Sequence, residues 1–223
     1  MSKKRKSYAW KDPSLLTRVV LVVLCLSMLL ILASLATDIG FGTAADYGTL
    51  AGQMTGAQLL RWLVDVLRLA VLLACITVLF WIVRASKNAH SFKPNMKMSP
   101  LGAIGWYLVP VAGWFKPFEA MSEIWQVSST QTDRRGDWLL NCWWGAFIVN
   151  NVVAAPVAFM GRQDAALVLP FKVASDAAGL VVTVLLFLLV RRVTAMQLEK
   201  RQAWMFEGEP EPRSATLLEG LAG

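Results

Sequence analysis

Histidine, cysteine and catalytic motifs are scarce in this chain, and each scarcity removes a class of function. The 223 residues include one histidine, His90, and three cysteines. A zinc site needs several such ligands at set spacings, so we expect no metal site and no bound cofactor. Neither a glycine-rich phosphate loop after a strand nor a G-x-S-x-G motif occurs. These absences favour a protein that is not an enzyme.

Charged residues are also few, and they are unevenly placed. Only 17% of the residues are charged, against about 25% in a typical soluble domain. Hydrophobic residues make up 56% of the chain, and the mean hydropathy is +0.50. The net charge of +7 comes from basic residues that flank apolar runs. Attraction to anionic lipid at the inner leaflet explains that pattern, so we expect no nucleic-acid partner.

Four long hydrophobic runs dominate what is present. They cover residues 19–36, 59–83, 138–160 and 173–190. Each is long enough, or nearly so, to cross a hydrocarbon core of about 30 Å at about 1.5 Å per residue. Lipid cannot satisfy backbone polar groups, so each run should be a helix. The predicted fold class is all-α, a polytopic membrane protein with four transmembrane helices.

The placement of Lys and Arg predicts the orientation. With these four spans, 18 of the 22 Lys and Arg residues fall on one side of the membrane. The positive-inside rule then places both ends of the chain in the cytoplasm. The membrane domain covers residues 19–198. A basic lead, 1–18, precedes it, and a cytoplasmic, mostly disordered tail, 199–223, follows it.

A fifth apolar stretch, residues 101–115, is short for a span and is broken by three glycines and Pro110. If it crossed the membrane, the basic residues after the last span would lie outside, against the positive-inside rule. We therefore predict a re-entrant or interfacial element over residues 99–118. A fifth span is the alternative.

Polar residues within the spans are candidate functional residues, because such groups often mark transport pathways. They are Asp65, Arg68, Asn150, Asn151 and Asp176. The two asparagines would line a polar path or, as we favour, hydrogen-bond to a neighbouring helix. Arg68 and Asp176 lie at nearly equal depth, so we predict a salt bridge between them, with Asp65 competing for the same arginine.

Two motifs stand out between the second and third spans. Residues 81–89 read W-x-x-R-A-x-x-N-A, and residues 99–110 read S-P-x-x-A-x-G-W-x-x-x-P. Together with residues 116–125 and the Trp143–Trp144 pair, they make the chain resemble a bacterial domain-of-unknown-function family, numbered four-three-two-eight. The resemblance covers roughly residues 60–200. The resemblance implies a bacterial multi-pass membrane protein, which we expect in the cytoplasmic membrane, and it brings no activity, substrate or catalytic residue.

The motif residues are candidates for structure or interaction. They are Trp81, Arg84, Asn88, Ser99, Pro100, Gly105, Trp106, Pro110, Pro117, Glu119, Glu123 and Trp125. We expect Arg84 and Asn88 to satisfy backbone groups that Pro110 and the glycines of the 99–110 segment leave unpaired. Glu119 and Glu123, four residues apart, are an acid–base pair or, as we favour, a solvated helix face.

Three functions follow from these patterns. We favour a non-enzymatic interaction or structural module of the membrane, which binds a membrane protein or a second copy of itself. The alternatives are a component of an oligomeric transporter or channel, and an inner-leaflet lipid-binding protein. The last rests on a basic collar that includes Lys93 and Lys97, beside Trp106 and Trp114.

Overall fold

The computed structural model describes residues 8–41, 54–109, 111–129, 137–160 and 165–207. All regular secondary structure in those ranges is helical. Four helices are long: α1 (Ser14–Phe41), α3 (Met54–Phe92), α6 (Asp137–Met160) and α7 (Ala165–Glu207). Each contains a stretch long and apolar enough to cross a membrane. The predicted fold class is confirmed.

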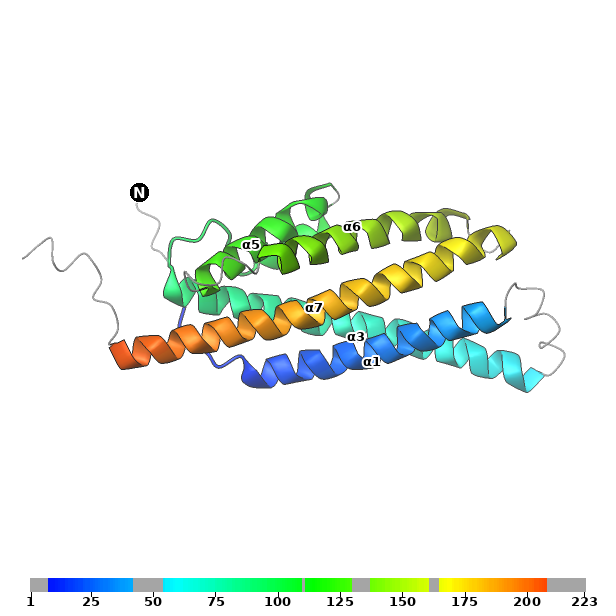
Figure 1. The fold of residues 1–223 in the computed structure, drawn as a ribbon, viewed down its shortest axis with the longest axis horizontal. Helices are drawn as coiled ribbons and strands as arrows, with labels where there is room; N and C mark the ends of the chain where they lie inside the picture. Colours follow the sequence, from blue (N-terminus) through cyan, green and yellow to red (C-terminus); the bar gives the residue numbers. More distant parts are fainter. Residues whose placement is uncertain (1–7, 42–53, 110, 130–136, 161–164, 208–223) are drawn as a thin grey trace, which may run out of the picture.

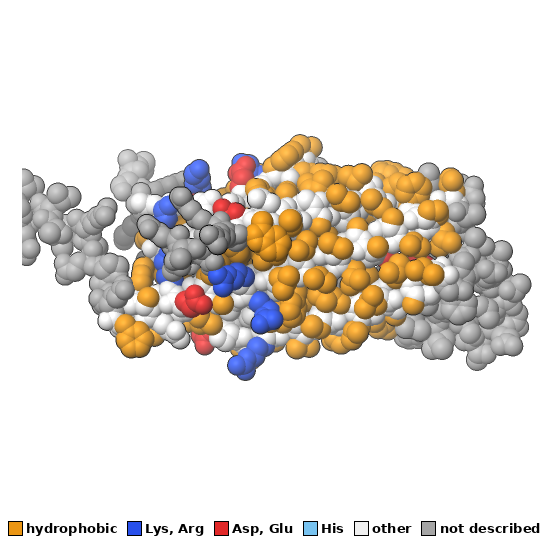
Figure 2. Space-filling view, viewed as in Figure 1, with side chains coloured by type: hydrophobic (Ala, Val, Ile, Leu, Met, Phe, Trp, Pro, Cys, Tyr) orange, Lys and Arg blue, Asp and Glu red, His pale blue; other side chains and the backbone are white. Residues whose placement is uncertain are grey.

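The four long helices lie side by side in an elongated bundle (Figure 1). At one end, α1 and α6 begin and α3 and α7 finish. We call this the basic end, because Lys and Arg side chains gather there in Figure 2 while hydrophobic side chains cover most of the rest of that face. The helix α7 passes the predicted boundary at residue 198 and continues to Glu207. The remainder of the predicted tail, 208–223, lies outside the described residues.

The long helices direct large apolar side chains outward. Leu29 of α1, Phe80 of α3 and Val152 of α6 are each more than half exposed. Such side chains in water would form large apolar patches, which soluble monomers rarely carry. In a bilayer the same side chains contact acyl chains at no cost. The exposed apolar surface therefore fits insertion into a membrane.

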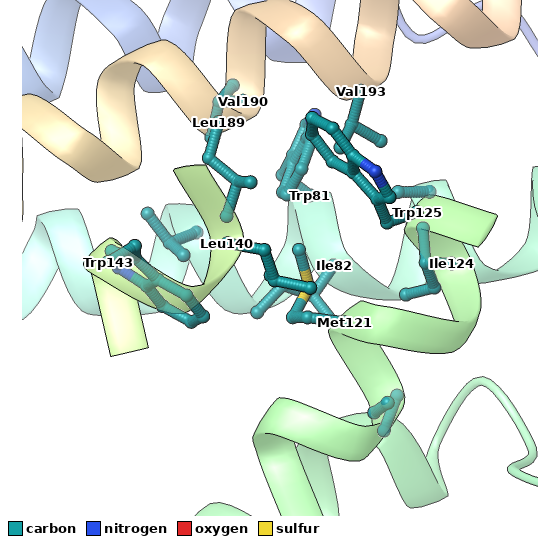
Figure 3. Packing of buried hydrophobic residues seen from close by; sticks show 14 of the residues in the cluster. Trp81, Ile82, Met121, Ile124, Trp125, Leu140, Trp143, Leu189, Val190 and Val193 are labelled. Carbon is teal, nitrogen blue, oxygen red and sulfur yellow. The ribbon is translucent and has the colours of Figure 1, made fainter. Parts of the chain in front are cut away.

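The densest packing lies toward the basic end. Figure 3 shows side chains from four helices meeting there. They are Trp81 and Ile82 of α3, Met121, Ile124 and Trp125 of α5, Leu140 and Trp143 of α6, and Leu189, Val190 and Val193 of α7. The helix α5 (Lys116–Ser128) is the short one of these four helices, and it packs against α3, α6 and α7.

The segment between α3 and α6 folds back without crossing the bundle. It contains α4 (Gly102–Gly105), η1 (Trp106–Leu108), η2 (Ala112–Trp114) and α5. The start of this segment is joined to α5, because the Glu123 carboxylate accepts hydrogen bonds from the backbone N–H groups of Lys97 (2.6 Å) and Met98 (3.2 Å). We call the part of the segment from residue 99 to residue 115 the hairpin. None of the described helices of this segment is long and apolar enough to cross a membrane, which fits the predicted re-entrant or interfacial element.

The turn of this hairpin is tight. Val111 has φ of 63°, a conformation that is unfavourable for a β-branched residue. A Cβ atom at Gly113 would lie 3.1 Å from the carbonyl oxygen of Trp106, so the backbone approaches itself closely there. Pro110 lies outside the described residues.

Candidate functional site

Asn88 fastens the chain before α1 to the end of α3. Its side chain is fully buried. Its Oδ1 accepts the backbone N–H of Lys11 at 3.1 Å, and its Nδ2 donates to the Lys11 carbonyl at 2.9 Å. A carboxamide offers one acceptor and two donors, so it can pair with both polar groups of one backbone residue. The second Nδ2 proton reaches the Gln197 Oε1 at 3.4 Å.

Gln197 joins three helices from its place on α7. It is also fully buried. Its Nε2 donates to the Ala85 carbonyl of α3 at 2.9 Å and to the Ser128 hydroxyl of α5 at 3.1 Å. Buried amides are costly unless their hydrogen bonds are made, so this arrangement fixes how the three helices meet.

A third link brings in α1. The Trp81 indole N–H donates to the Thr194 hydroxyl at 3.3 Å, and that hydroxyl shares a hydrogen bond of 2.9 Å with the Thr17 hydroxyl. All three side chains are buried. We call the whole network the polar latch: Thr17, Trp81, Asn88, Ser128, Thr194 and Gln197.

The structure gives Arg84 and Asn88 other hydrogen-bond partners than those predicted. Asn88 bonds to Lys11 and Gln197, and the Arg84 guanidinium reaches the Asp12 carbonyl at 3.5 Å. Among the described residues, neither side chain forms a hydrogen bond with the 99–109 segment. The reason is helical spacing, which puts Asn88 seven residues after Trp81 on the face of α3 toward α7 and the N-terminal lead. The 99–105 turn satisfies itself instead, since the Ser99 hydroxyl accepts the Gly102 N–H at 3.0 Å.

A groove of about 600 Å³ runs along α5 beside the latch. One wall is a face of α5 from Phe118 to Val127, and the other is the stretch 92–98 that follows α3. Three lysines, Lys93, Lys97 and Lys200, are among the residues that line it. Lys200 closes one end, where it donates to the Val127 carbonyl at 2.5 Å and lies 5.5 Å from the centre of the Phe92 ring.

The two carboxylates of the groove do not form an acid–base pair. Glu123 accepts the two backbone N–H groups described above, and Glu119 pairs with Lys116 at 2.7 Å on an exposed surface. Within the described part of the chain, no carboxylate lies within 4.0 Å of the ammonium groups of Lys93, Lys97 or Lys200. The groove therefore combines apolar side chains with a small excess of positive charge, and both of its carboxylates have other partners.

The remaining motif residues divide into buried and exposed groups. Pro117, in the first turn of α5, and Pro100 are buried, and Trp125 is 1% exposed within the core. Ser99, Gly105 and Trp106 are exposed. The buried group shapes the α5 platform. The exposed group lies on the hairpin, whose surface also carries Val111, Trp114 and Phe115.

The opposite end of the bundle holds a second polar cluster. Lys172 of α7 pairs with Asp176 one turn later at 3.3 Å and with Asp38 at the end of α1. The Ser34 hydroxyl donates to Asp176 at 2.8 Å. Sequence reasoning missed Lys172 and Asp38. The i, i+4 spacing of Lys172 and Asp176 was the available signal.

The side chains of Arg68 and Asp65 lie outside the described residues, so the salt bridge predicted between Arg68 and Asp176, with Asp65 competing for the arginine, stays a prediction. The role predicted for Asn151 was wrong, because its Nδ2 donates to the Phe147 carbonyl of its own helix at 2.7 Å. Asn150 does face α7, since its Oδ1 lies 3.6 Å from the position that a Cβ would take at Gly179. That Oδ1 is buried and has no hydrogen-bond partner among the described residues.

Comparison with known proteins identifies a family. Curated proteins and solved structures give no match to the chain. A family model, described as a domain of unknown function (DUF4328), matches residues 46–195. Those residues contain both motifs, α5 and all of the latch except Thr17 and Gln197. The match covers well over half of the sequence, and the chain therefore belongs to the DUF4328 family.

Proposed function

We propose that this chain is a non-enzymatic interaction module of the bacterial cytoplasmic membrane, with the basic end in the cytoplasm and the α5 groove as its binding surface. The distribution of Lys and Arg supports the orientation, because 18 of 22 fall on the side of the basic end. The exposed apolar side chains of the four long helices support the location.

One observation carries the proposal: the groove is held between elements that the polar latch locks together. Ser128 at the end of α5, Ala85 on α3 and Gln197 on α7 share hydrogen bonds, so the two walls and the closed end cannot move independently. A surface that is already in its bound shape loses little entropy when a partner binds. A groove that is held in one shape at the basic end and carries a small excess of positive charge is suited to binding a partner.

Site-specific photo-crosslinking in native membranes tests this. A photoreactive amino acid replaces Ser122, which lines the groove, or Val152, which faces outward from α6. We expect one defined adduct from position 122 that is absent at position 152. The adduct partner is a second copy, another membrane protein or a lipid. The same heterogeneous labelling at both positions would contradict a groove-specific partner.

The cluster at the opposite end favours a second candidate, a component of an oligomeric transporter. Lys172 carries one positive charge between the carboxylates of Asp38 and Asp176, and such groups at membrane depth often bind protons or ions. Reconstituted liposomes test it. Transport requires ion or solute flux above that of empty vesicles, and flux that is lost in Lys172→Met; vesicles with no flux contradict transport.

A further inference from the structure

The groove lies across the inner headgroup layer when the basic end faces the cytoplasm. The start of α5 is deep, because the Phe118 ring packs 6.0 Å from that of Trp144. Trp144 lies about two turns, or roughly 10 Å, into α6. The end of α5 is shallow, because Ser128 contacts Gln197 on the part of α7 that has already passed Arg191. The helix therefore extends from the hydrocarbon boundary into the cytoplasm.

The lining of the groove changes character along this direction. Phe118 lies at the deep end and Met98 at mid-height, where its backbone meets Glu123. Lys200 lies at the shallow end with the Phe92 ring, and Lys93 follows Phe92 directly. Lys93 and Lys200 thus lie on the water side of the groove, and Lys97 lies at mid-height beside Met98. Phe118 supplies apolar contact on the membrane side, where the charge of Glu119 is paired with Lys116.

The hairpin beside the groove is itself suited to the membrane surface. Val111 and Phe115 are 75% and 64% exposed, and the Trp106 and Trp114 rings are also exposed. Tryptophan favours the headgroup region, and exposed apolar residues next to it favour the acyl boundary. The hairpin ends at the start of α5, so it holds the deep end of the groove next to lipid.

We infer that the α5 groove binds one anionic phospholipid of the inner leaflet, with its phosphate near Lys93, Lys97 and Lys200 and an acyl chain along Met98 and Phe118. Charge complementarity supports this, because the three lysines outnumber the two carboxylates of the groove, and both carboxylates already have other partners. Glu119 pairs with Lys116, and Glu123 accepts backbone N–H groups. An acidic peptide would match the lysines but would leave the apolar, membrane-facing end unused. The inference rests on the proposed function and names the partner of the same groove.

Native mass spectrometry of the full chain, titrated in detergent with phosphatidylglycerol or with phosphatidylcholine, tests the inference. We expect one phosphatidylglycerol to remain bound and phosphatidylcholine to dissociate. Lys93→Gln with Lys97→Gln should weaken phosphatidylglycerol binding by about fivefold for each ammonium lost. The matched control is Lys11→Gln with Lys87→Gln, which removes the same charge from the exposed surface outside the groove and should leave binding unchanged.

A steric variant separates shape from charge. Ser122→Trp fills the groove at unchanged net charge and should abolish retention of phosphatidylglycerol, at an unchanged melting temperature. Equal losses in the two double-lysine variants, or full retention in Ser122→Trp, would overturn the inference. A groove-specific protein adduct at position 122 without phosphatidylglycerol binding would overturn the lipid assignment alone. If position 122 gives no defined adduct and phosphatidylglycerol does not bind either, the proposed function would be overturned as well.

Discussion

Replacing Asn88 with Leu should unfold the basic end at a lower temperature, although the two side chains are close in size. The change removes the hydrogen bonds to the Lys11 N–H and carbonyl and leaves the Gln197 Oε1 without its donor. Two good hydrogen bonds and one long one contribute about 2–3 kcal/mol in total. Leu recovers little of this, because the fully buried site is lined by the polar groups that Asn88 satisfied.

The measurement is thermal unfolding in detergent, followed by intrinsic tryptophan fluorescence. For a chain of this size each kcal/mol shifts the melting temperature by about 2–4 °C, so we expect a fall of roughly 5–10 °C. Two controls match the change: Asn141→Leu replaces an exposed asparagine near the start of α6, and Lys93→Leu replaces an exposed lysine on the same side of the bundle. Both should stay close to the wild type. Equal melting temperatures for the Asn88 and Asn141 variants would refute the role of the latch.

Three further predictions concern topology and the cluster at the opposite end. Reporter fusions after residue 128 should give green fluorescence and no alkaline phosphatase activity; a periplasmic signal would mean that the 99–118 element crosses the membrane. Lys172→Met should lower the melting temperature by a few degrees, because it leaves the nearly buried Asp38 without its cation, although exposure of Lys172 moderates the loss. Arg68→Asp should destabilise the protein, and adding Asp176→Arg should restore much of the loss if the two pair. A double variant less stable than either single would show that Lys172 is the partner of Asp176.

The membrane-spanning part of the fold is readable from sequence because lipid imposes a simple rule on it. A helix in hydrocarbon must form all its backbone hydrogen bonds internally and expose apolar side chains. Long apolar runs such as 138–160 are therefore easy to identify in the sequence. The sequence predicts a re-entrant or interfacial element for a related reason. Residues 101–115 are apolar, yet they form a short run that is rich in glycine.

The polar latch could not be predicted from the sequence, because the groups that its side chains bind produce no recognisable sequence pattern. Asn88 binds the backbone of Lys11, and any residue at that position would present the same N–H and carbonyl. Thr194 and Gln197 lie after the last apolar run, where polar residues normally indicate a solvated helix. These two side chains are buried because α5 packs against α3 and α7 and covers that face of α7. Glu123 was likewise selected as a carboxylate and proved to act on backbone N–H groups.

The location of the core follows from which solvent surrounds each part of the bundle. In hydrocarbon, helices gain nothing from hiding leucine, because lipid tails are as apolar as the side chain. At the basic end, water and headgroups replace the tails, and burying Trp81 or Trp125 is favourable again. The same boundary explains the latch, since polar side chains near water can be brought inside once they are paired. The basic end combines tight packing with the hydrogen bonds of the polar latch. It is therefore the part of the chain that can hold a groove in a fixed shape.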